Sequence, residues 1–269
     1  LKGGSDAIES NKEIVKWLRT GLSRAGLPED SLQLITDKKM PFGYVEAYKS
    51  LRTNLDFMAG SMDVHTLVIT STVPEESKSN VAVNLALTLA ESGKKVALVD
   101  CDLRKPVLHR YLKAGHNVKG VSNVLSNQCT LDEALQELKE MNLTFLPAGT
   151  PPPNPSEMLS QPQMQAMVNT LREKFDVVIF DAPPVSVVTD AAVIGRYVDG
   201  AMFVVRSDYA PADAVRGAVK KLQDAGVRVL GSVLTRYDMK KALKGSSYAY
   251  SYAYNYNYAY GKQDATAGK

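Results

Sequence analysis

Short, almost wholly apolar runs recur along the middle of the chain, and between them apolar residues return at helical spacing. Apolar runs of about four to eight residues are typical of strands buried on both faces of a sheet. They predict strands over Thr66–Thr70, Lys95–Val99, Leu143–Leu146, Val177–Phe180, Ala201–Val205 and Val227–Leu234. The intervening stretches predict helices over Ser79–Ala90, Leu131–Leu138, Met164–Phe175 and Ala212–Ala225. This succession predicts an α/β fold, a mostly parallel sheet flanked by helices on both faces.

The two ends of the chain differ from this middle part. Helical periodicity predicts two helices ahead of the first strand, over 8–22 and about 44–57. Near the other end, a tract reads SYAYSYAYNYNYAY, which alternates Tyr with Ala, Ser or Asn and offers no apolar complement for a core. We therefore expect three parts: a lead over 1–40, a folded domain over 41–240 and a mobile Tyr-rich tail over 241–269.

Composition narrows the class of protein without identifying it. Two cysteines and three histidines exclude a disulfide framework and a Cys/His zinc module, which favours a reducing, cytosolic compartment. The net charge of +3 gives no argument for nucleic-acid binding. A membrane span is not predicted, because the chain has no run of about 18 apolar residues.

The first predicted strand leads through a Ser- and Glu-rich turn into a helix, which is the setting of a phosphate-binding loop. In such loops backbone N–H groups bind phosphates, a lysine meets the β- and γ-phosphates, and a Ser or Thr hydroxyl ligates Mg²⁺. Lys78 and Ser79 stand at those two positions, but Thr72 and Ser77 replace the glycines of G-x-x-x-x-G-K-[ST]. The predicted nucleotide-binding residues are Thr72, Val73, Pro74, Glu75, Glu76, Ser77, Lys78, Ser79 and Asn80.

The altered loop leaves two interpretations open. Ser77 has to adopt the strained backbone that glycine normally supplies, at about 1 kcal/mol, and Glu75 and Glu76 bring negative charge toward bound phosphates. An ordinary strand–turn–helix with a serine cap would show the same residues. The segment by itself therefore does not decide between a nucleotide site and a plain turn.

Two further strands end in aspartate, at the edge of the sheet where ligands of open α/β folds bind. Asp100 and Asp102 follow one strand and could hold a hydrated Mg²⁺, although a solvated loop of paired charges is the alternative. Asp181 follows four apolar residues, the Walker B pattern, in which the carboxylate reaches Mg²⁺ through a water. Three strands that deliver such residues to one edge favour a nucleotide site.

Together with other segments, these motifs resemble the cytoplasmic catalytic domain of the bacterial tyrosine kinases (BY-kinases), P-loop proteins that share motifs with MinD/ParA ATPases. The resemblance rests on EAYKSLRTNL from Glu46, the loop before Lys78, VALVDCDLRKP around Asp100, LPAGTPPPNPSE from Leu146, and the terminal tyrosines. It implies a MinD/ParA-like P-loop fold that uses ATP and Mg²⁺. Lys78 would neutralise phosphates, Ser79, Asp100 and Asp181 would hold the metal, and Asp102 would orient or accept the proton of the attacking tyrosine.

The resemblance also implies assembly. In the family an E-x-x-R-x-x-R helix docks into the neighbouring subunit of a ring, and Glu46, Lys49 and Arg52 occupy that pattern, with Lys49 in place of the first arginine. A solvated, charged helix face is the alternative. Tyr48 on the same helix has apolar neighbours, which favour core packing over a role as a phosphorylation site.

The tail is the expected phosphorylation site, because each phenol in an extended chain can reach a neighbour's active site. Its tyrosines are Tyr248, Tyr250, Tyr252, Tyr254, Tyr256, Tyr258 and Tyr260. Each phosphate adds about −1.5 to −2 charges, and the resulting repulsion could break a ring held by charge pairs. An aggregation-prone tract without a regulatory role is the alternative.

By resemblance, the expected function is an Mg–ATP-dependent protein-tyrosine kinase that autophosphorylates in trans and regulates capsular or exopolysaccharide synthesis and export. The expected partners are other copies of the chain, a membrane adaptor and a cognate tyrosine phosphatase, with no nucleic acid. The expected place is the cytoplasmic face of the membrane, reached through the adaptor or a missing N-terminal membrane part; residues 1–40 are expected to be linker or fused adaptor sequence. A pseudokinase scaffold with an eroded nucleotide site and a MinD/ParA-type ATPase switch remain the alternatives.

Overall fold

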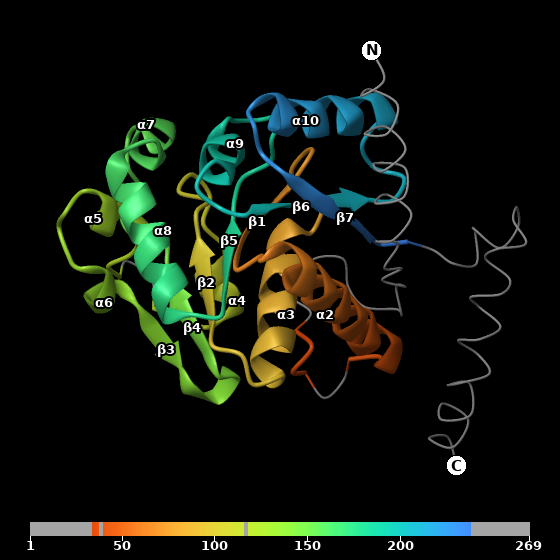
Figure 1. Cartoon of the computed structure of the whole chain (residues 1–269), viewed down its shortest axis with the longest axis horizontal. Helices are drawn as coiled ribbons and strands as arrows, with labels where there is room; N and C mark the ends of the chain where they lie inside the picture. The colour runs from red at the N-terminus through yellow and green to blue at the C-terminus, as the bar shows by residue number, and fades with distance from the viewer. Residues whose placement is uncertain (1–33, 38–39, 116–117, 238–269) are drawn as a thin grey trace, which may run out of the picture.

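A seven-stranded sheet runs through the middle of the protein, with helices on both faces (Figure 1). The computed structural model describes residues 34–37, 40–115 and 118–237, so the helix expected over 8–22 and the Tyr-rich tail lie outside the described residues. The strand order is β3-β4-β2-β5-β1-β6-β7, and every pairing is parallel except that of β3 with β4. The strands are β1 Thr66–Ser71, β2 Val96–Asp100, β3 Gln136–Leu138, β4 Leu143–Leu146, β5 Val177–Asp181, β6 Gly200–Arg206 and β7 Val229–Thr235. The expected α/β fold with a mostly parallel sheet is confirmed.

The helices divide between the two faces of the sheet, and each group covers one hydrophobic core. On one face lie α2 Phe42–Met62, α3 Lys78–Glu91 and α4 Leu108–Tyr111. On the other lie α5 Val121–Leu125, α6 Leu131–Ala134, α7 Pro155–Leu159, α8 Pro162–Lys174, α9 Asp190–Gly195 and α10 Ala212–Asp224. None of the helices in the described ranges is long and apolar enough to cross a bilayer.

The central strands are apolar without interruption because both of their faces are covered. In β1, Leu67 and Ile69 pack under α2 and α3, while Val68 packs into the core on the opposite face. All residues of β1, β2 and β5 are buried. The side chains of a strand alternate between its faces, so the middle positions of a strand covered on both faces are apolar, and polar residues are found at its two ends.

The helix expected over Leu131–Leu138 is wrong in its second half. Helix α6 ends at Ala134, Leu135 is extended with φ −68° and ψ 133°, and Gln136–Leu138 forms the edge strand β3. This strand pairs antiparallel with β4 through a 3₁₀ turn, η1 Lys139–Met141, and a left-handed Asn142 with φ 49°. Leu131, Leu135 and Leu138 have helical spacing, but three residues are too few to determine the secondary structure. Backbone pairing with β4 therefore decides that Gln136–Leu138 is a strand.

Part of the expected lead packs on the folded domain. Ile35 is buried, and its N–H donates to the Asn84 side chain in α3 at 2.8 Å. Helix α2 then lies along α3, with Tyr48 and Leu51 buried between them. The core position expected for Tyr48 is confirmed.

Candidate active site

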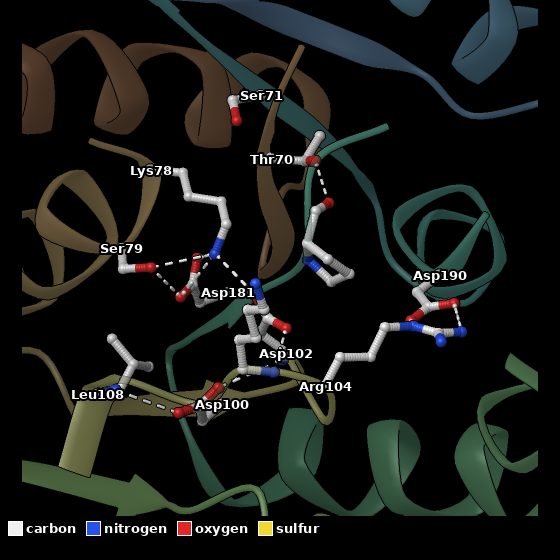
Figure 2. Close-up of polar contacts among 12 residues, drawn as sticks. Thr70, Ser71, Lys78, Ser79, Asp100, Asp102, Arg104, Leu108, Asp181 and Asp190 are labelled. Atoms are coloured by element: carbon white, nitrogen blue, oxygen red, sulfur yellow. Dashed lines mark hydrogen bonds and ion pairs between the residues drawn. The ribbon is translucent and has the colours of Figure 1, made fainter. Parts of the chain in front are cut away.

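Five of the predicted site residues meet at the carboxyl edge of the three central strands: Lys78, Ser79, Asp100, Asp102 and Asp181 (Figure 2). Because β5 lies between β2 and β1, the register sets Asp181 beside Asp100 on one side and Ile69 on the other. The turn after β1 brings Lys78 and Ser79 to the same edge at the start of α3. The sheet topology thus gathers groups that are about a hundred residues apart in the chain.

Lys78 lies among carboxylates. Its Nζ is 3.2 Å from Asp102 Oδ2 and 3.4 Å from Asp181 Oδ1, and it donates to Ser79 Oγ at 3.1 Å. The Ser79 hydroxyl in turn donates to Asp181 Oδ2 at 2.5 Å. Burial favours the neutral amine of Lys78, but Asp181, Asp102 and Asp100 together outweigh it and raise the pKa of Lys78. Lys78 is therefore a fixed cation at the start of α3.

Asp100 is the most deeply perturbed acid of the site. It is buried and accepts hydrogen bonds from the N–H groups of Leu108 and Asp102, each at 3.2 Å. Burial, and after it the charge of Asp181, raises the pKa of Asp100 to about 8 despite the opposing effect of Lys78. Burial also raises the pKa of Asp181, against the pull of Lys78 and Ser79. These carboxylates gain most from a divalent cation, which removes their mutual repulsion.

The loop before α3 takes up glycine-like backbone at two positions without glycine. Ser77 adopts the left-handed conformation, with φ 70° and ψ 22°, as expected for the residue in place of the second motif glycine. Glu75 is also left-handed, with φ 66°, which the sequence did not indicate. Each such residue costs roughly 1–2 kcal/mol relative to glycine. The Ser77 side chain makes no capping hydrogen bond to α3, and a helix N-terminus is a favourable place for a phosphate.

Glu76 does not direct its charge at the phosphate position. Its carboxylate is buried and accepts from the N–H of Val73 at 2.8 Å and from the N–H of Arg206 at 3.2 Å. Its carbonyl accepts from the Thr235 hydroxyl at 3.0 Å. Glu76 thus fastens the loop to the ends of β6 and β7, and its negative charge is taken up by backbone donors.

Two residues at and just after the end of β6, Arg206 and Tyr209, support the strained tip of the loop. The Arg206 guanidinium lies 4.3 Å from the centroid of the Tyr209 ring and donates to the Glu75 carbonyl at 3.4 Å. The Tyr209 hydroxyl donates to Glu75 Oε2 at 3.3 Å. Sequence reasoning missed both residues, because they lie more than a hundred positions from the loop and belong to no phosphate motif.

A second group holds the segment that carries Asp102. Arg104 Nε donates to Asp190 at 3.0 Å, and Arg104 Nη2 donates to the Ser156 hydroxyl at 2.9 Å. Asp190 is fully buried at the start of α9, and Ser156, in α7, donates to it at 2.5 Å. Ser156 belongs to the motif LPAGTPPPNPSE, so this motif directly contacts the segment that carries Asp102.

Asn80 faces away from the phosphate position. Its side-chain oxygen accepts from the hydroxyls of Tyr44 and Tyr48 of α2, at 2.9 and 3.1 Å, and from the Asn84 amide at 3.2 Å. Burial raises the pKa of Tyr44 to about 12, so both hydroxyls stay protonated donors. The side chain of Asn80 thus ties α2 to α3, whereas sequence analysis placed Asn80 among the nucleotide-binding residues.

The three residues of α2 that occupy the expected subunit-docking pattern, Glu46, Lys49 and Arg52, differ in their surroundings. Lys49 pairs with Glu46 at 2.7 Å on the helix surface. Arg52 instead donates to the Thr88 carbonyl in α3 at 3.0 Å. Arg52 therefore contributes to packing within the chain, and Glu46 and Lys49 face outward.

The residues present suit a nucleotide-bound Mg²⁺. Within 34–37, 40–115 and 118–237, no three His, Cys, Asp or Glu side chains form a ready metal-binding group. Mg²⁺ at phosphate sites needs no such group, because one or two carboxylates, waters and the phosphates complete its shell. Ser79 and Asp181 are hydrogen-bonded to each other beside Asp100. The buried Thr72 hydroxyl lacks a hydrogen-bond partner in the described part of the chain.

Comparison with known proteins assigns the family. Residues 76–206 match the family model described as an AAA domain. The chain is 36% identical over 203 residues to tyrosine-protein kinase YwqD of Bacillus subtilis, covering 76% of this chain and 84% of YwqD. It is 32% identical over 200 residues to tyrosine-protein kinase CpsD of Streptococcus agalactiae, covering 74% of this chain and 85% of CpsD. The kinase domain of the Escherichia coli tyrosine kinase ETK superposes with a TM-score of 0.75 at 29% identity, over 84% of this chain and 91% of that domain. The chain therefore belongs to the bacterial tyrosine-protein kinases, a family of P-loop NTPases with protein-tyrosine kinase activity.

Proposed function

We propose that this chain transfers the γ-phosphoryl group of Mg–ATP to the tyrosines of its own C-terminal cluster, in trans between neighbouring copies. The observation that carries the proposal is the convergence of Lys78, Ser79, Asp102 and Asp181 at the N-terminus of α3. A cation, a hydroxyl and carboxylates at a helix N-terminus are what phosphoryl transfer requires, since its catalysis is mainly positioning and charge stabilisation.

Each residue then has a defined task. Lys78 binds β- and γ-phosphate oxygens, while Ser79, Asp181 and Asp100 hold Mg²⁺. The metal, when bound, neutralises the charge that develops on the phosphates. Asp102 receives the proton of the tyrosine hydroxyl as the phenolic oxygen bonds to phosphorus and ADP leaves. The Lys105 N–H, which donates to Asp102 Oδ1 at 3.0 Å, fixes that carboxylate.

The wider role follows from the family resemblance. The tail tyrosines Tyr248–Tyr260 are the acceptors, and the outward pair Glu46 and Lys49 on α2 docks on the next subunit of a ring. A membrane adaptor of the polysaccharide export system holds the ring at the inner face of the membrane, and a tyrosine phosphatase resets the tail. Phosphorylation then regulates capsular or exopolysaccharide synthesis and export through charge repulsion within the ring.

Intact-mass spectrometry tests the activity. Phosphatase-treated chain is incubated with Mg²⁺ and ATP, alongside Lys78→Met and the matched surface variant Lys221→Met. We expect steps of about 80 Da, one per phosphate, in the native chain and in Lys221→Met but not in Lys78→Met. Transfer in trans is tested with two proteins. The enzyme is a full-length chain whose seven tail tyrosines are replaced by phenylalanine, and the substrate is Lys78→Met, which keeps its tail. Phosphorylation of Lys78→Met in this mixture shows transfer in trans. An unchanged ladder in isolated Lys78→Met overturns the proposal.

The two left-handed residues in the loop favour one alternative, a pseudokinase scaffold that binds nucleotide weakly. Ser77 and Glu75 store strain that a glycine-containing loop avoids. Calorimetric titration with Mg–ADP separates the two functions. Submicromolar affinity supports an intact nucleotide site, whereas no measurable binding together with an absent ladder supports the scaffold.

A further inference from the structure

The segment that follows Asp102 is strongly and unusually basic. We call residues 103–119 the basic segment. It holds Arg104, Lys105, His109, Arg110, Lys113, His116 and Lys119, and the chain has no Asp or Glu from 103 to 131. The whole chain has a net charge of only +3, so this local excess of cations is not a general property of the surface.

The basic segment starts within the catalytic site. Its Lys105 N–H donates to Asp102, and its Leu108 N–H donates to Asp100 Oδ2 at 3.2 Å. Leu108 and Leu112 are buried in the core beside α3, which fixes helix α4 next to the carboxyl edge of β2. Figure 2 shows Asp100, Asp102 and Leu108 together at this edge. The backbone of the segment from Lys105 to Leu108 is therefore held directly beside the proposed position of phosphoryl transfer.

Among the five Arg and Lys residues of the basic segment, two have ion-pair partners in the described part of the chain and three have none there. Arg104 is bound by Asp190 and Ser156, and Lys119 lies 3.5 Å from Glu133. Lys105, Arg110 and Lys113 are exposed, and among the described residues they form no ion pair. Three unpaired cations beside a kinase site fit an anionic partner better than a neutral one.

We propose that Lys105, Arg110 and Lys113 bind phosphotyrosines already made on the tail of a neighbouring copy, and so hold the next unmodified tyrosine at Asp102. The inference rests on the proposed autophosphorylation. Residues 246–260 contain no charged side chain, so the basic segment attracts this tract only after the first phosphate is added. Each phosphate then brings about −1.5 to −2 charges.

The spacing of the tail tyrosines suits this arrangement. They occur at every second position, and in an extended chain such residues project on the same side, about 7 Å apart. A phosphotyrosine two or four positions from the acceptor thus lies about 7 to 14 Å from the acceptor. The first phosphorylation is slow, and each later one is favoured by its neighbours. Partly phosphorylated tails are therefore consumed faster than unmodified ones.

Kinetics with synthetic peptides of residues 245–262 test the inference. The enzyme is the full-length chain with its seven tail tyrosines replaced by phenylalanine, so that its own tail does not compete. One peptide is unmodified, and the other carries a phosphate on Tyr256. We expect kcat/KM per acceptor to be about tenfold higher for the phosphopeptide at low salt, and the ratio to fall as salt screens the charges.

A matched pair of variants locates the effect. Arg110→Gln/Lys113→Gln removes two cations that do not touch Asp102, and we expect the ratio to fall to about threefold or below with the unmodified peptide unaffected. Lys221→Gln/Arg228→Gln removes two exposed cations near the opposite edge of the sheet and leaves the ratio unchanged. A ratio of one in the unsubstituted enzyme, or a ratio that survives Arg110→Gln/Lys113→Gln, overturns the inference.

A binding measurement separates this inference from the kinase proposal. If neither peptide is phosphorylated, the kinase proposal fails, and fluorescence anisotropy with the labelled phosphopeptide still tests the surface. Salt-sensitive binding that Arg110→Gln/Lys113→Gln weakens supports the inference. Absent binding overturns it, and so does stronger capture by phosphatidylserine vesicles than by the phosphopeptide, which would assign the surface to a membrane.

Discussion

Arg104 binds the fully buried carboxylate of Asp190 at 3.0 Å, and this contact joins the segment after β2 that carries Asp102 to the start of α9. The two residues are 86 positions apart. Arg104 is two residues beyond Asp102, so the ion pair restrains the backbone that carries the proposed proton acceptor. The pair is asymmetric, because the Arg104 side chain is 38% exposed and that of Asp190 is 0% exposed.

This asymmetry predicts unequal effects of the two single substitutions. Arg104→Met leaves Asp190 buried with Ser156 as its one remaining side-chain donor among the described residues, which costs about 3 kcal/mol of unfolding free energy. Asp190→Asn leaves a half-exposed arginine that water can solvate, and it costs about 1 kcal/mol. Urea denaturation of both variants measures the difference. Equal destabilisation would contradict the assignment of Asp190 as the buried, dependent partner.

The same contact predicts a kinetic signature. Arg104→Lys keeps a charge but loses the paired contacts with Asp190 and Ser156, so Asp102 is less well fixed. We expect kcat to fall about tenfold while the affinity for Mg–ADP changes less than twofold, because the residues proposed to bind nucleotide are not touched. A loss of nucleotide affinity equal to the loss of kcat would show instead that the substitution disturbs the whole site.

Backbone strain in the phosphate loop predicts a gain of stability on restoring glycine. Ser77 sits at φ 70°, so Ser77→Gly relieves about 1 kcal/mol, whereas Ser77→Ala keeps the Cβ and brings no gain. Thermal unfolding of the two variants without nucleotide makes the comparison. If the strain also opposes phosphate binding, Ser77→Gly in addition tightens Mg–ADP binding, measured by calorimetry.

The candidate site at the carboxyl edge could be predicted from the sequence because each part is local to its own strand. An apolar run that ends in Asp100 or Asp181 indicates both the strand and its carboxyl end, and parallel strands bring those ends together. The arrangement of Lys78 and Ser79 followed from the same logic. Even the left-handed Ser77 was predictable, since the motif has a glycine at that position.

What the sequence did not indicate depends on contacts between distant residues. The partner of Arg104 is Asp190, and the supports of Glu75 are Arg206 and Tyr209, none of which belongs to a phosphate motif. Strand β3 is three residues long and exists only because β4 offers it backbone partners. Such pairings are decided by tertiary structure, so spacing within one segment cannot reveal them.

The elevated pKa of Asp100 predicts how stability depends on pH in the absence of Mg²⁺. The folded carboxyl has a pKa of about 8 against an ordinary value of 3.8, so between these values the folded state binds a proton that the unfolded chain has lost. Asp100 therefore makes the free energy of unfolding fall as pH rises from about 4 to 8, with no further change above that range. Asp100→Asn removes this titration.

Urea denaturation in EDTA checks the prediction by following the native chain and Asp100→Asn at several pH values. The variant's stability relative to the native chain should increase from pH 5 to pH 8. A difference that stays constant with pH would mean that Asp100 is ionised in the folded state throughout.

Sequence analysis placed Asn80 in the nucleotide site, but its side chain contacts the two tyrosines of α2. This contact predicts that Asn80 contributes to stability. Asn80→Ala leaves the hydroxyls of Tyr44 and Tyr48 without this acceptor, so it should cost about 2 kcal/mol of unfolding free energy while Mg–ADP affinity changes little. Tyr48→Phe removes one donor and should cost about 1 kcal/mol. Because the two substitutions break the same hydrogen bond, their costs in the double variant should sum to less than the separate values. Additive costs, or a large loss of nucleotide affinity in Asn80→Ala, would return Asn80 to the nucleotide site and would remove its role as the polar link between α2 and α3.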